Sequence, residues 1–134
     1  MNVMRGPRVV RPNVLAVDEE PLKRLMYERV LGVTAEVVCV ASSGEAMAAL
    51  ERRPIDVMVV AQRMSDVLGS EMARFVRARW PRVRVVVVAD QDDDPWLAAA
   101  VRGGLVDRVL GVPFWRRELQ EAVMDVVWRP RVSA

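Results

Sequence analysis

The sequence predicts an α/β protein in which a parallel sheet of five strands carries helices on both faces. Short apolar runs alternate with segments of helical periodicity along the chain, which is typical of repeated strand–helix units. The first, third and fourth runs are almost continuously apolar, as strands buried on both faces are. The runs with strand character cover residues 13–17, 36–41, 56–60, 83–89 and 107–111.

The first strand, NVLAV at 13–17, leads into a segment with helical periodicity. Gly32 is in a position to cap the C-terminus of that helix. The residues that recur at helical spacing, and that we expect to face the core, are Leu22, Leu25, Met26 and Val30.

The second strand, EVVCVA at 36–41, precedes two serines. Ser42 or Ser43 can cap the N-terminus of a helix that runs through Arg53. We expect the inward side of this helix to consist of Ala46, Met47 and Leu50.

The third strand, DVMVV at 56–60, leads through a loop to a helix that Pro81 ends. The side chains that we place on one face of this helix are Met72, Phe75, Val76 and Trp80.

The fourth strand, VRVVVVA at 83–89, is followed by a clear helix start at Asp94-Pro95, where a capping residue precedes proline at the first helical position. The pair Gly103-Gly104 ends this helix. We expect its inward residues to be Leu97, Ala100, Val101 and Gly104.

The fifth strand, DRVLG at 107–111, precedes a last helix that stops before Pro130. The apolar stripe of this helix consists of Leu119, Ala122, Val123, Val126 and Val127. We therefore expect one domain at 13–128, with an N-terminal tail at 1–12 and a C-terminal tail at 129–134.

The composition fits one globular domain and excludes several kinds of chemistry. The chain has 134 residues, of which 52% are hydrophobic and 28% charged. It contains no histidine, which excludes imidazole acid–base work and histidine-based nucleophile pairs, and its lone Cys39 excludes a disulfide framework. No apolar run approaches the roughly 20 residues that span a bilayer, and the N-terminus lacks the apolar region of a secretory signal. We therefore predict a cytoplasmic protein without a membrane segment, and not an enzyme.

The basic residues predict no nucleic-acid binding by this domain. Nineteen of the 20 are arginines, and the net charge is only +2. The arginines are scattered along the chain in pairs with acids between them, without one basic stripe and interleaved aromatics. The pairs are Arg52-Arg53, Arg77/Arg79, Arg82/Arg84 and Arg116-Arg117.

Several motifs, in order and at matching spacing, resemble the receiver domain of bacterial response regulators. They are PNVLAVDEEPL, IDVMVVAQRMSDVLG, ARWPRVRVVVVA and GGLVDRVLGVPF. The resemblance covers about residues 12–128 and is strongest to receivers attached to phosphodiesterase or hydrogenase-type regulator outputs. It implies a flavodoxin-like fold, with strand order 2-1-3-4-5, and a role in two-component phosphorelay signalling.

The departures from the family pattern lie at the positions that carry its chemistry. The phospho-accepting aspartate falls on Ala61, and the hydroxyl residue that ends the fourth strand falls on Ala89. The lysine before the proline falls on Val112, and the switch aromatic of the fifth strand on Val109. The resemblance therefore implies a pseudo-receiver, in which the acidic pair Asp18 and Glu19 is what remains of the phosphorylation pocket.

Each departure removes a chemical requirement. An acyl phosphate needs a carboxylate nucleophile, which Ala61 does not offer. A cationic side chain must neutralise the developing charge, and a hydroxyl must donate to the phosphoryl group, but Val112 and Ala89 can do neither. We therefore expect no cofactor and no response to phosphate.

The remaining acids have two interpretations. Asp18 and Glu19 could hold a divalent ion weakly, or they could place favourable negative charge at the start of the first helix. An acidic segment could rebuild an anionic pocket with Asp18, or it could form a solvated turn in which Asp94 caps a helix. Its acids are Asp90, Asp92, Asp93 and Asp94.

Aromatic and arginine side chains mark a candidate interface. In receivers, the fourth helix, fifth strand and fifth helix form the usual partner surface, and tryptophan and arginine are enriched at protein interfaces. The candidate residues are Trp96, Arg102, Arg108, Trp115 and Arg116. These aromatics could also pack against the rim of their own domain.

The sequence thus predicts a phosphorylation-independent signalling module that binds a protein partner, or a second copy of itself, through this face. The alternative is a sensor that binds a small ligand or ion in the vacated pocket, since replacing charged residues by alanine and valine makes that pocket more apolar.

Overall fold

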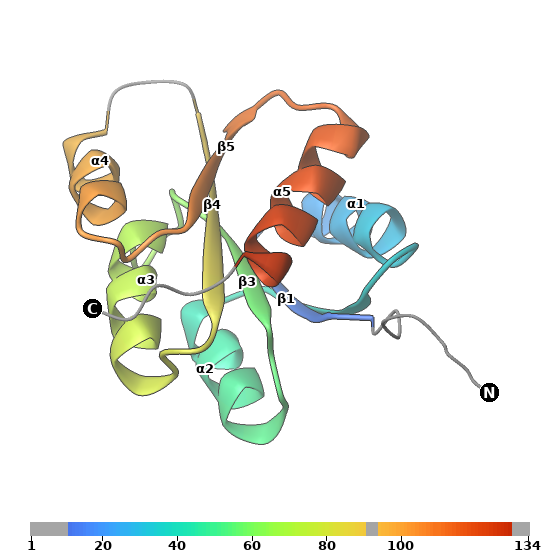
Figure 1. Ribbon diagram of the computed structural model, residues 1–134, viewed down its shortest axis with the longest axis horizontal. Coiled ribbons are helices and arrows are strands. Elements are labelled where there is room, and N and C mark those ends of the chain that lie inside the picture. Colours follow the sequence, from blue (N-terminus) through green and yellow to red (C-terminus); the bar gives the residue numbers. More distant parts are fainter. Residues whose placement is uncertain (1–10, 91–93, 130–134) are drawn as a thin grey trace.

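A computed structural model gives the structure of the protein, and it describes residues 11–90 and 94–129 (Figure 1). Five strands alternate with five helices. The strands are β1 (Asn13–Val17), β2 (Glu36–Val40), β3 (Val57–Ala61), β4 (Arg84–Asp90) and β5 (Arg108–Val112). The helices are α1 (Pro21–Leu31), α2 (Ser43–Arg52), α3 (Gly69–Arg79), α4 (Pro95–Arg102) and α5 (Arg116–Trp128).

All strand pairs are parallel, and the order in the sheet is β2-β1-β3-β4-β5. The predicted fold class and strand order are confirmed. The parallel arrangement brings the carboxyl ends of all five strands to one edge of the sheet, which fixes where the candidate site can lie.

Each face of the sheet has its own core. Helices α1 and α5 cover one face, where Leu31 and Leu119 pack against Val59 and Val86. Helices α2, α3 and α4 cover the other face, where Leu50 and Val76 pack against the same strands from behind (Figure 1). Strands β1, β3 and β4 are buried almost throughout, as their continuous apolar sequences predict.

Several helix ends follow the predicted signals. Ser42 caps α2 by accepting from the backbone N–H of Glu45. Asp94 caps α4 and is followed by Pro95 at the first helical position. Gly104, just past the end of α4, has φ of +76°, a conformation that side chains with a Cβ rarely adopt.

Some of the expected inward faces are wrong. In α1, Leu22 is 79% exposed and Leu25 is also exposed, because the helix turns Tyr27 and Leu31 to the core instead. Phe75 of α3 and Val101 of α4 are exposed as well. Both helices cover the sheet with alanines and one or two larger side chains, so these residues remain at the outer rim.

The N-terminal segment predicted as a tail is bound to the domain at its last residues. The Arg11 guanidinium donates to the carbonyl oxygens of Gly32, Val33 and Ala35 at 2.8–3.2 Å and pairs with Glu36 at 2.9 Å. The remainder of both predicted tails, 1–10 and 130–134, lies outside the described residues. None of the helices in the described ranges has the length and apolarity needed to cross a bilayer.

Candidate functional site

The carboxyl ends of the strands bring together the residues that the sequence singled out. Val17 pairs with Val60 across β1 and β3, so the residues that follow them, Asp18 and Ala61, lie at neighbouring positions at the carboxyl ends of these strands. Ala89 lies at the same edge in β4, and Val112 is the last residue of β5. The five residues of the predicted degenerate pocket, Glu19 among them, therefore share one edge of the sheet.

Asp18 is a buried carboxylate with one unsatisfied oxygen. Its side chain is 3% exposed, and Oδ1 accepts the backbone N–H of Glu20 at 2.9 Å. Oδ2 is buried without a hydrogen-bond partner in the described part of the protein. Burial raises the pKa of the Asp18 carboxyl above its ordinary value, an effect that the hydrogen bond from Glu20 only partly opposes. The charged form of Asp18 is therefore held at a cost.

Glu19 joins two loops at the same edge. Its Oε2 accepts the backbone N–H of Ser65 at 2.8 Å and also accepts from the Ser65 hydroxyl. Ser65 lies in the connection between β3 and α3, so this carboxylate ties the β1–α1 loop to the β3–α3 loop. The Glu19 carboxylate is thus engaged in a structural contact with Ser65.

The other three positions contribute only apolar surface. Ala61 and Val112 are half-buried at the ends of their strands, and Ala89 is buried. None has a side-chain group that can attack, donate or neutralise charge. The edge of the sheet therefore has an acidic corner at Asp18 and Glu19 and an apolar remainder.

Gln62, which the sequence analysis did not select, organises this edge. It is 2% exposed, and its amide nitrogen donates to Ser70 Oγ at 3.0 Å and to Asp94 Oδ2 at 2.9 Å. Its amide oxygen accepts the backbone N–H of Ser70 at 2.8 Å. Gln62 therefore links the end of β3, the start of α3 and the N-cap of α4. Its signal in the sequence is a polar residue placed directly after a buried strand.

The start of α3 lies so close to β3 that it requires glycine. A Cβ on Gly69 would lie 2.6 Å from the carbonyl oxygen of Ala61, which is shorter than real contacts allow. The Gly69 N–H donates to the carbonyl oxygen of Gln62 at 2.9 Å. Glycine at this position therefore lets the β3–α3 connection fold back onto the end of the strand.

The described residues do not form a complete site for the divalent ion that Asp18 and Glu19 could hold. Mg²⁺ takes six oxygen ligands in near-octahedral order. Asp18 Oδ2 is an uncommitted oxygen, but Glu19 Oε2 is engaged with Ser65, and Ala61 supplies no side-chain oxygen. Among the residues described, no group of three or more acidic, histidine or cysteine side chains is placed to hold a metal.

The acidic segment after β4 is only partly described. Asp92 and Asp93 lie outside the described residues. Asp94 caps α4, with Oδ1 accepting the backbone N–H groups of Trp96 and Leu97 at 3.0 and 3.2 Å. The hydrogen bond from Gln62 lowers the pKa of the Asp94 carboxyl, and the two backbone donors act in the same direction.

An apolar cavity of about 460 Å³ lies beside the site, between α1 and the β5–α5 connection. Val88, Val112 and Tyr27 are among its lining residues. The Tyr27 hydroxyl is buried without a partner among the described residues, and burial raises its pKa above the ordinary tyrosine value. Val112 is thus the residue of the candidate site that borders this cavity.

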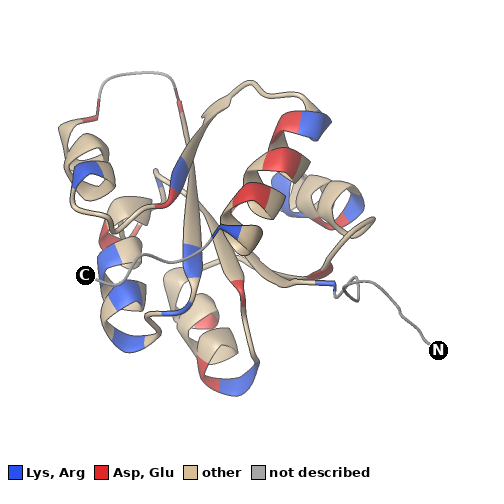
Figure 2. Cartoon of the chain, in the orientation of Figure 1, with Lys and Arg blue, Asp and Glu red and all other residues tan. Residues whose placement is uncertain are grey.

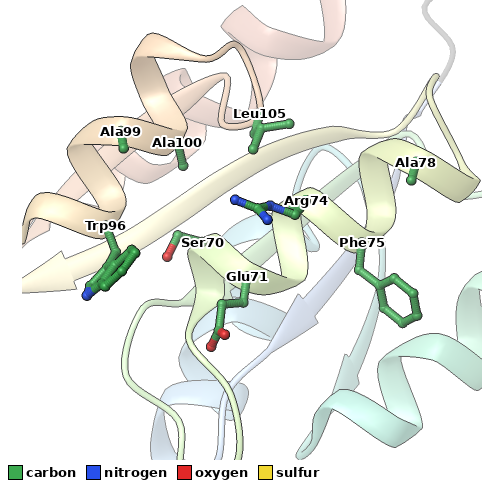
Figure 3. Close-up of a pocket in the computed structure, with 9 residues that line it drawn as sticks. All are labelled: Ser70, Glu71, Arg74, Phe75, Ala78, Trp96, Ala99, Ala100 and Leu105. Atoms are coloured by element: carbon green, nitrogen blue, oxygen red, sulfur yellow. The ribbon is translucent and has the colours of Figure 1, made fainter.

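The candidate interface residues fall on different parts of the surface. Trp96 is 70% exposed and lines a groove of about 620 Å³ between α3 and α4, together with Arg74 and Phe75 (Figure 3). Trp115 is 79% exposed and lines the cavity beside α1 instead, together with Arg116. The two tryptophans therefore belong to separate hollows.

The other interface candidates lie near or on β5. Arg102 is exposed at the end of α4. Val109, the position of the switch aromatic in the family pattern, is exposed in β5. Arg108 pairs with Asp125 of α5 at 2.7 Å, which holds its guanidinium against its own domain.

Comparison with known proteins adds a family to this geometry. The family model of the response regulator receiver domain matches residues 14–124. The chain is 35% identical over 98 residues to the hydrogenase transcriptional regulatory protein HoxA of Cupriavidus necator. That match covers 72% of the chain and 20% of the regulator, so the chain spans about a fifth of this relative's length.

Solved structures agree on the fold. The structure of adenylate cyclase from Rhodopirellula baltica superposes with a TM-score of 0.83 at 24% identity, over 88% of each chain. A response regulator receiver domain protein (CheY-like) from Methanospirillum hungatei superposes with a TM-score of 0.81 at 18% identity, over 88% of this chain and 94% of that one. At these identities the likeness concerns the fold alone.

Proposed function

Because the chain belongs to the response regulator receiver domain family, we propose that it is a two-component signalling module that works without phosphorylation. It keeps one conformation and acts by contact with a protein partner. The observation that carries this proposal is the apolar character of three strand-end positions, Ala61, Ala89 and Val112, at one edge of the sheet.

The chemistry of phosphoryl transfer supports the first half of the proposal. Ala61 stands at the position of the nucleophile and offers only a methyl group, so no acyl phosphate can form there. Position 112 carries valine where the family pattern has lysine, and position 89 carries alanine where it has a hydroxyl residue. The loss of all three groups removes both bond formation and charge stabilisation.

Two hydrogen-bonded ties support a fixed conformation. Glu19 holds the β3–α3 loop through Ser65, and Gln62 holds the N-cap of α4 through Asp94. Both ties use groups of the protein itself, so neither requires a phosphoryl group or a metal ion. A receiver with such ties has the loops around its pocket ordered in advance.

The test uses phosphate chemistry that acts on ordinary receivers. The chain is incubated with Mg²⁺ and either acetyl phosphate or beryllofluoride, and amide chemical shifts and intact mass are measured. We expect no phosphoryl adduct and no shift changes at residues near Ala61, Ala89 and Val112. A phosphoryl adduct on Asp18 or Asp90, with shift changes that spread to β5, would overturn the proposal.

A restored variant serves as the matched control. Ala61→Asp/Val112→Lys returns the nucleophile and the cation to the same scaffold. Modification of this variant by acetyl phosphate, under conditions that leave the original chain unmodified, would assign the difference to those two positions.

Light scattering over a wide concentration range addresses the partner. A mass of two chains that Trp96→Ala or Trp115→Ala returns to one would support a homodimer through the surface that carries that tryptophan. The mass of a monomer at every concentration would exclude the homodimer and leave a different protein as the partner.

A second candidate function is the sensing of a small apolar ligand. The cavity of about 460 Å³ beside Val112 and the unpartnered Tyr27 hydroxyl favour it, because binding sites are concave, mostly apolar and carry a few polar groups. A fragment screen read by chemical shifts tests this idea. Shift changes around Tyr27 and Val112 that Tyr27→Phe weakens would support it, and a silent screen would count against it.

A further inference from the structure

The end of the sheet opposite the candidate site carries an apolar pit surrounded by arginines. The strands β3 and β4 begin there, and α2 and α3 end there, so segments from both helix–strand connections meet. The pit has a volume of about 370 Å³. We call it the arginine-rimmed pit, because Arg53, Arg79 and Arg82 line it around apolar residues that include Leu50, Trp80 and Val83.

The fold gathers arginines that are scattered in the sequence. Arg53 comes from the end of α2, Arg79 from the end of α3, and Arg82 from the α3–β4 connection. Figure 2 shows blue segments at the ends of α2 and α3, both towards the lower end of the view. The sequence pattern of separate pairs thus becomes one basic surface.

Some of these positive charges are already paired, and others are not. Arg79 pairs with Glu51 of α2. Arg53 and Arg82 are exposed, and among the described residues neither has a carboxylate partner within salt-bridge distance. The pit therefore has two guanidinium groups available at its rim.

The floor of the pit is apolar and belongs to the core, because Leu50 and Val83 are buried. The exposed Pro54 and Pro81 stiffen the wall through their fixed backbone φ angles. Trp80 is half-buried, with the Arg79 guanidinium 4.9 Å from its ring centre. Such a floor is ordered before a partner arrives, so binding costs little side-chain entropy. It can accept one apolar side chain, while the rim can pair with carboxylates.

We propose that the arginine-rimmed pit docks an acidic segment of a partner protein, with an apolar side chain of that segment in the pit and its carboxylates on Arg53 and Arg82. Arginine forms bidentate pairs with carboxylates and is enriched with tryptophan at protein interfaces. A nucleic acid fits less well, because it requires several phosphate contacts along an extended basic stripe, whereas this surface is one pit interrupted by Glu51.

This surface is separate from the strand ends that carry the proposed function. The N-terminal ends of parallel strands lie at the opposite edge from their carboxyl ends. The failure of either proposal would therefore leave the other standing.

The test uses the full chain and a short polyglutamate peptide with one central leucine. Binding is measured by tryptophan fluorescence and amide chemical shifts at low salt. A matched peptide with serine in place of leucine tests the pit, and a single-stranded DNA of mixed sequence tests the competing class of partner.

Two double variants make the comparison specific. Arg53→Gln/Arg82→Gln removes two charges at the rim, and Arg29→Gln/Arg117→Gln removes two exposed charges from α1 and α5. We expect the rim variant to weaken peptide binding roughly tenfold and the control variant less than about twofold. The serine peptide should bind more weakly than the leucine peptide, and added salt should weaken both. Thermal unfolding of both variants checks that they are folded.

Several outcomes would overturn the proposal. Equal weakening by the two double variants would show unspecific attraction, and equal binding of the two peptides would remove the role of the pit. Tighter binding of the DNA would assign the surface to nucleic acid. Self-association that Arg53→Gln/Arg82→Gln abolishes would replace the external partner by a second copy of the chain, and the absence of any peptide binding would remove the proposed partner.

Discussion

The unpaired oxygen of Asp18 leads to a prediction at the scale of single residues. Burial raises the pKa of this carboxyl in the folded state, so the folded chain binds the proton more tightly than the unfolded chain. The associated stability is present below the unfolded pKa and is lost as the pH rises through the folded pKa. Asp18→Asn keeps an acceptor for Glu20 and removes the charge, and we expect it to stabilise the protein by about 1 kcal/mol at pH 7.

Urea unfolding of this variant at several pH values is the measurement. The advantage over the original chain should shrink as the pH falls through the raised pKa of Asp18, because the carboxyl of the original chain then becomes protonated. Glu121→Gln, an exposed change on α5, is the control and should show no such trend. A destabilised Asp18→Asn at pH 7 would contradict the explanation.

Gln62 leads to a second prediction at this scale. Gln62→Met preserves the size of the side chain but removes the donor to Asp94 and the acceptor for the Ser70 N–H. We expect a loss of about 2 kcal/mol, because buried polar groups at Ser70 lose their partners. The pKa of Asp94 should rise, since the Gln62 amide is the main cause of its lowering.

Carbon-detected NMR titration of Asp94 measures this change. A lowered folded pKa gives stability that is present above the unfolded pKa and lost as the pH falls through the folded pKa. The variant should therefore lose less stability on acidification than the original chain does. Gln120→Met removes a comparable amide, which donates to Val30 at 3.1 Å, and should leave the pKa of Asp94 where it is.

Single residues also show the limit of prediction from the sequence. Asp18 and Ala61 could be placed at the strand ends, because a buried apolar run announces where each strand stops. Gln62 could not be assigned a role, because its partners Ser70 and Asp94 are 8 and 32 residues away. These hydrogen bonds form only because the β3–α3 loop folds back onto the end of β3.

At the scale of elements, the buried face of α1 differs from the face that the sequence predicted. The expected stripe began at Leu22, whereas the structure buries Tyr27 and Leu31. Leu31 is 1% exposed, and we expect Leu31→Ala to cost about 2–5 kcal/mol by leaving a cavity. Leu22→Gln should change the free energy of unfolding by less than about 0.5 kcal/mol.

Chemical denaturation of the two variants decides between the faces. A large loss of unfolding free energy for Leu22→Gln, together with a small loss for Leu31→Ala, would support the buried face that the sequence predicted.

The elements themselves were predictable because their signals are local. Ser42 caps α2, and Asp94 with Pro95 starts α4, as the residue types indicate. The faces were less predictable, because short helices carry apolar residues on more than one side. Phe75 and Val101 fit a helical stripe by spacing, but the rotation of each helix on the sheet leaves them exposed.

At the scale of the whole molecule, the central strands of the sheet are better protected from solvent than the two outer strands. Strands β1, β3 and β4 are covered on both faces, whereas β2 and β5 lie at the edges and are partly exposed. We expect backbone amides of β3 to exchange with solvent only on global unfolding, and those of β5 to exchange through local opening.

Native-state hydrogen exchange followed by NMR measures this difference. With increasing denaturant below the unfolding transition, exchange from β3 should accelerate while exchange from β5 should change little. Equal protection in both strands would contradict the expected weakness of the β5 edge.

The distribution of charge is the whole-molecule property that the sequence concealed. Arg53 and Arg82 are almost thirty positions apart in the chain, and they meet because α2 and α3 run in the same direction over one face of the sheet. The sum of charges, +2, describes neither this basic end nor the acidic corner at Asp18.

The buried carboxyl of Asp18 also bears on the order in which a phosphorylation site could be engineered into this chain. Aspartate placed first at position 61 would set a second carboxylate near Asp18, whose Oδ2 has no hydrogen-bond partner among the described residues, and like charges so close oppose each other's ionisation. Lysine placed first at position 112 would add a compensating cation to the same end of the sheet. We therefore expect a route that begins at position 112 to pass through a more stable intermediate than one that begins at position 61.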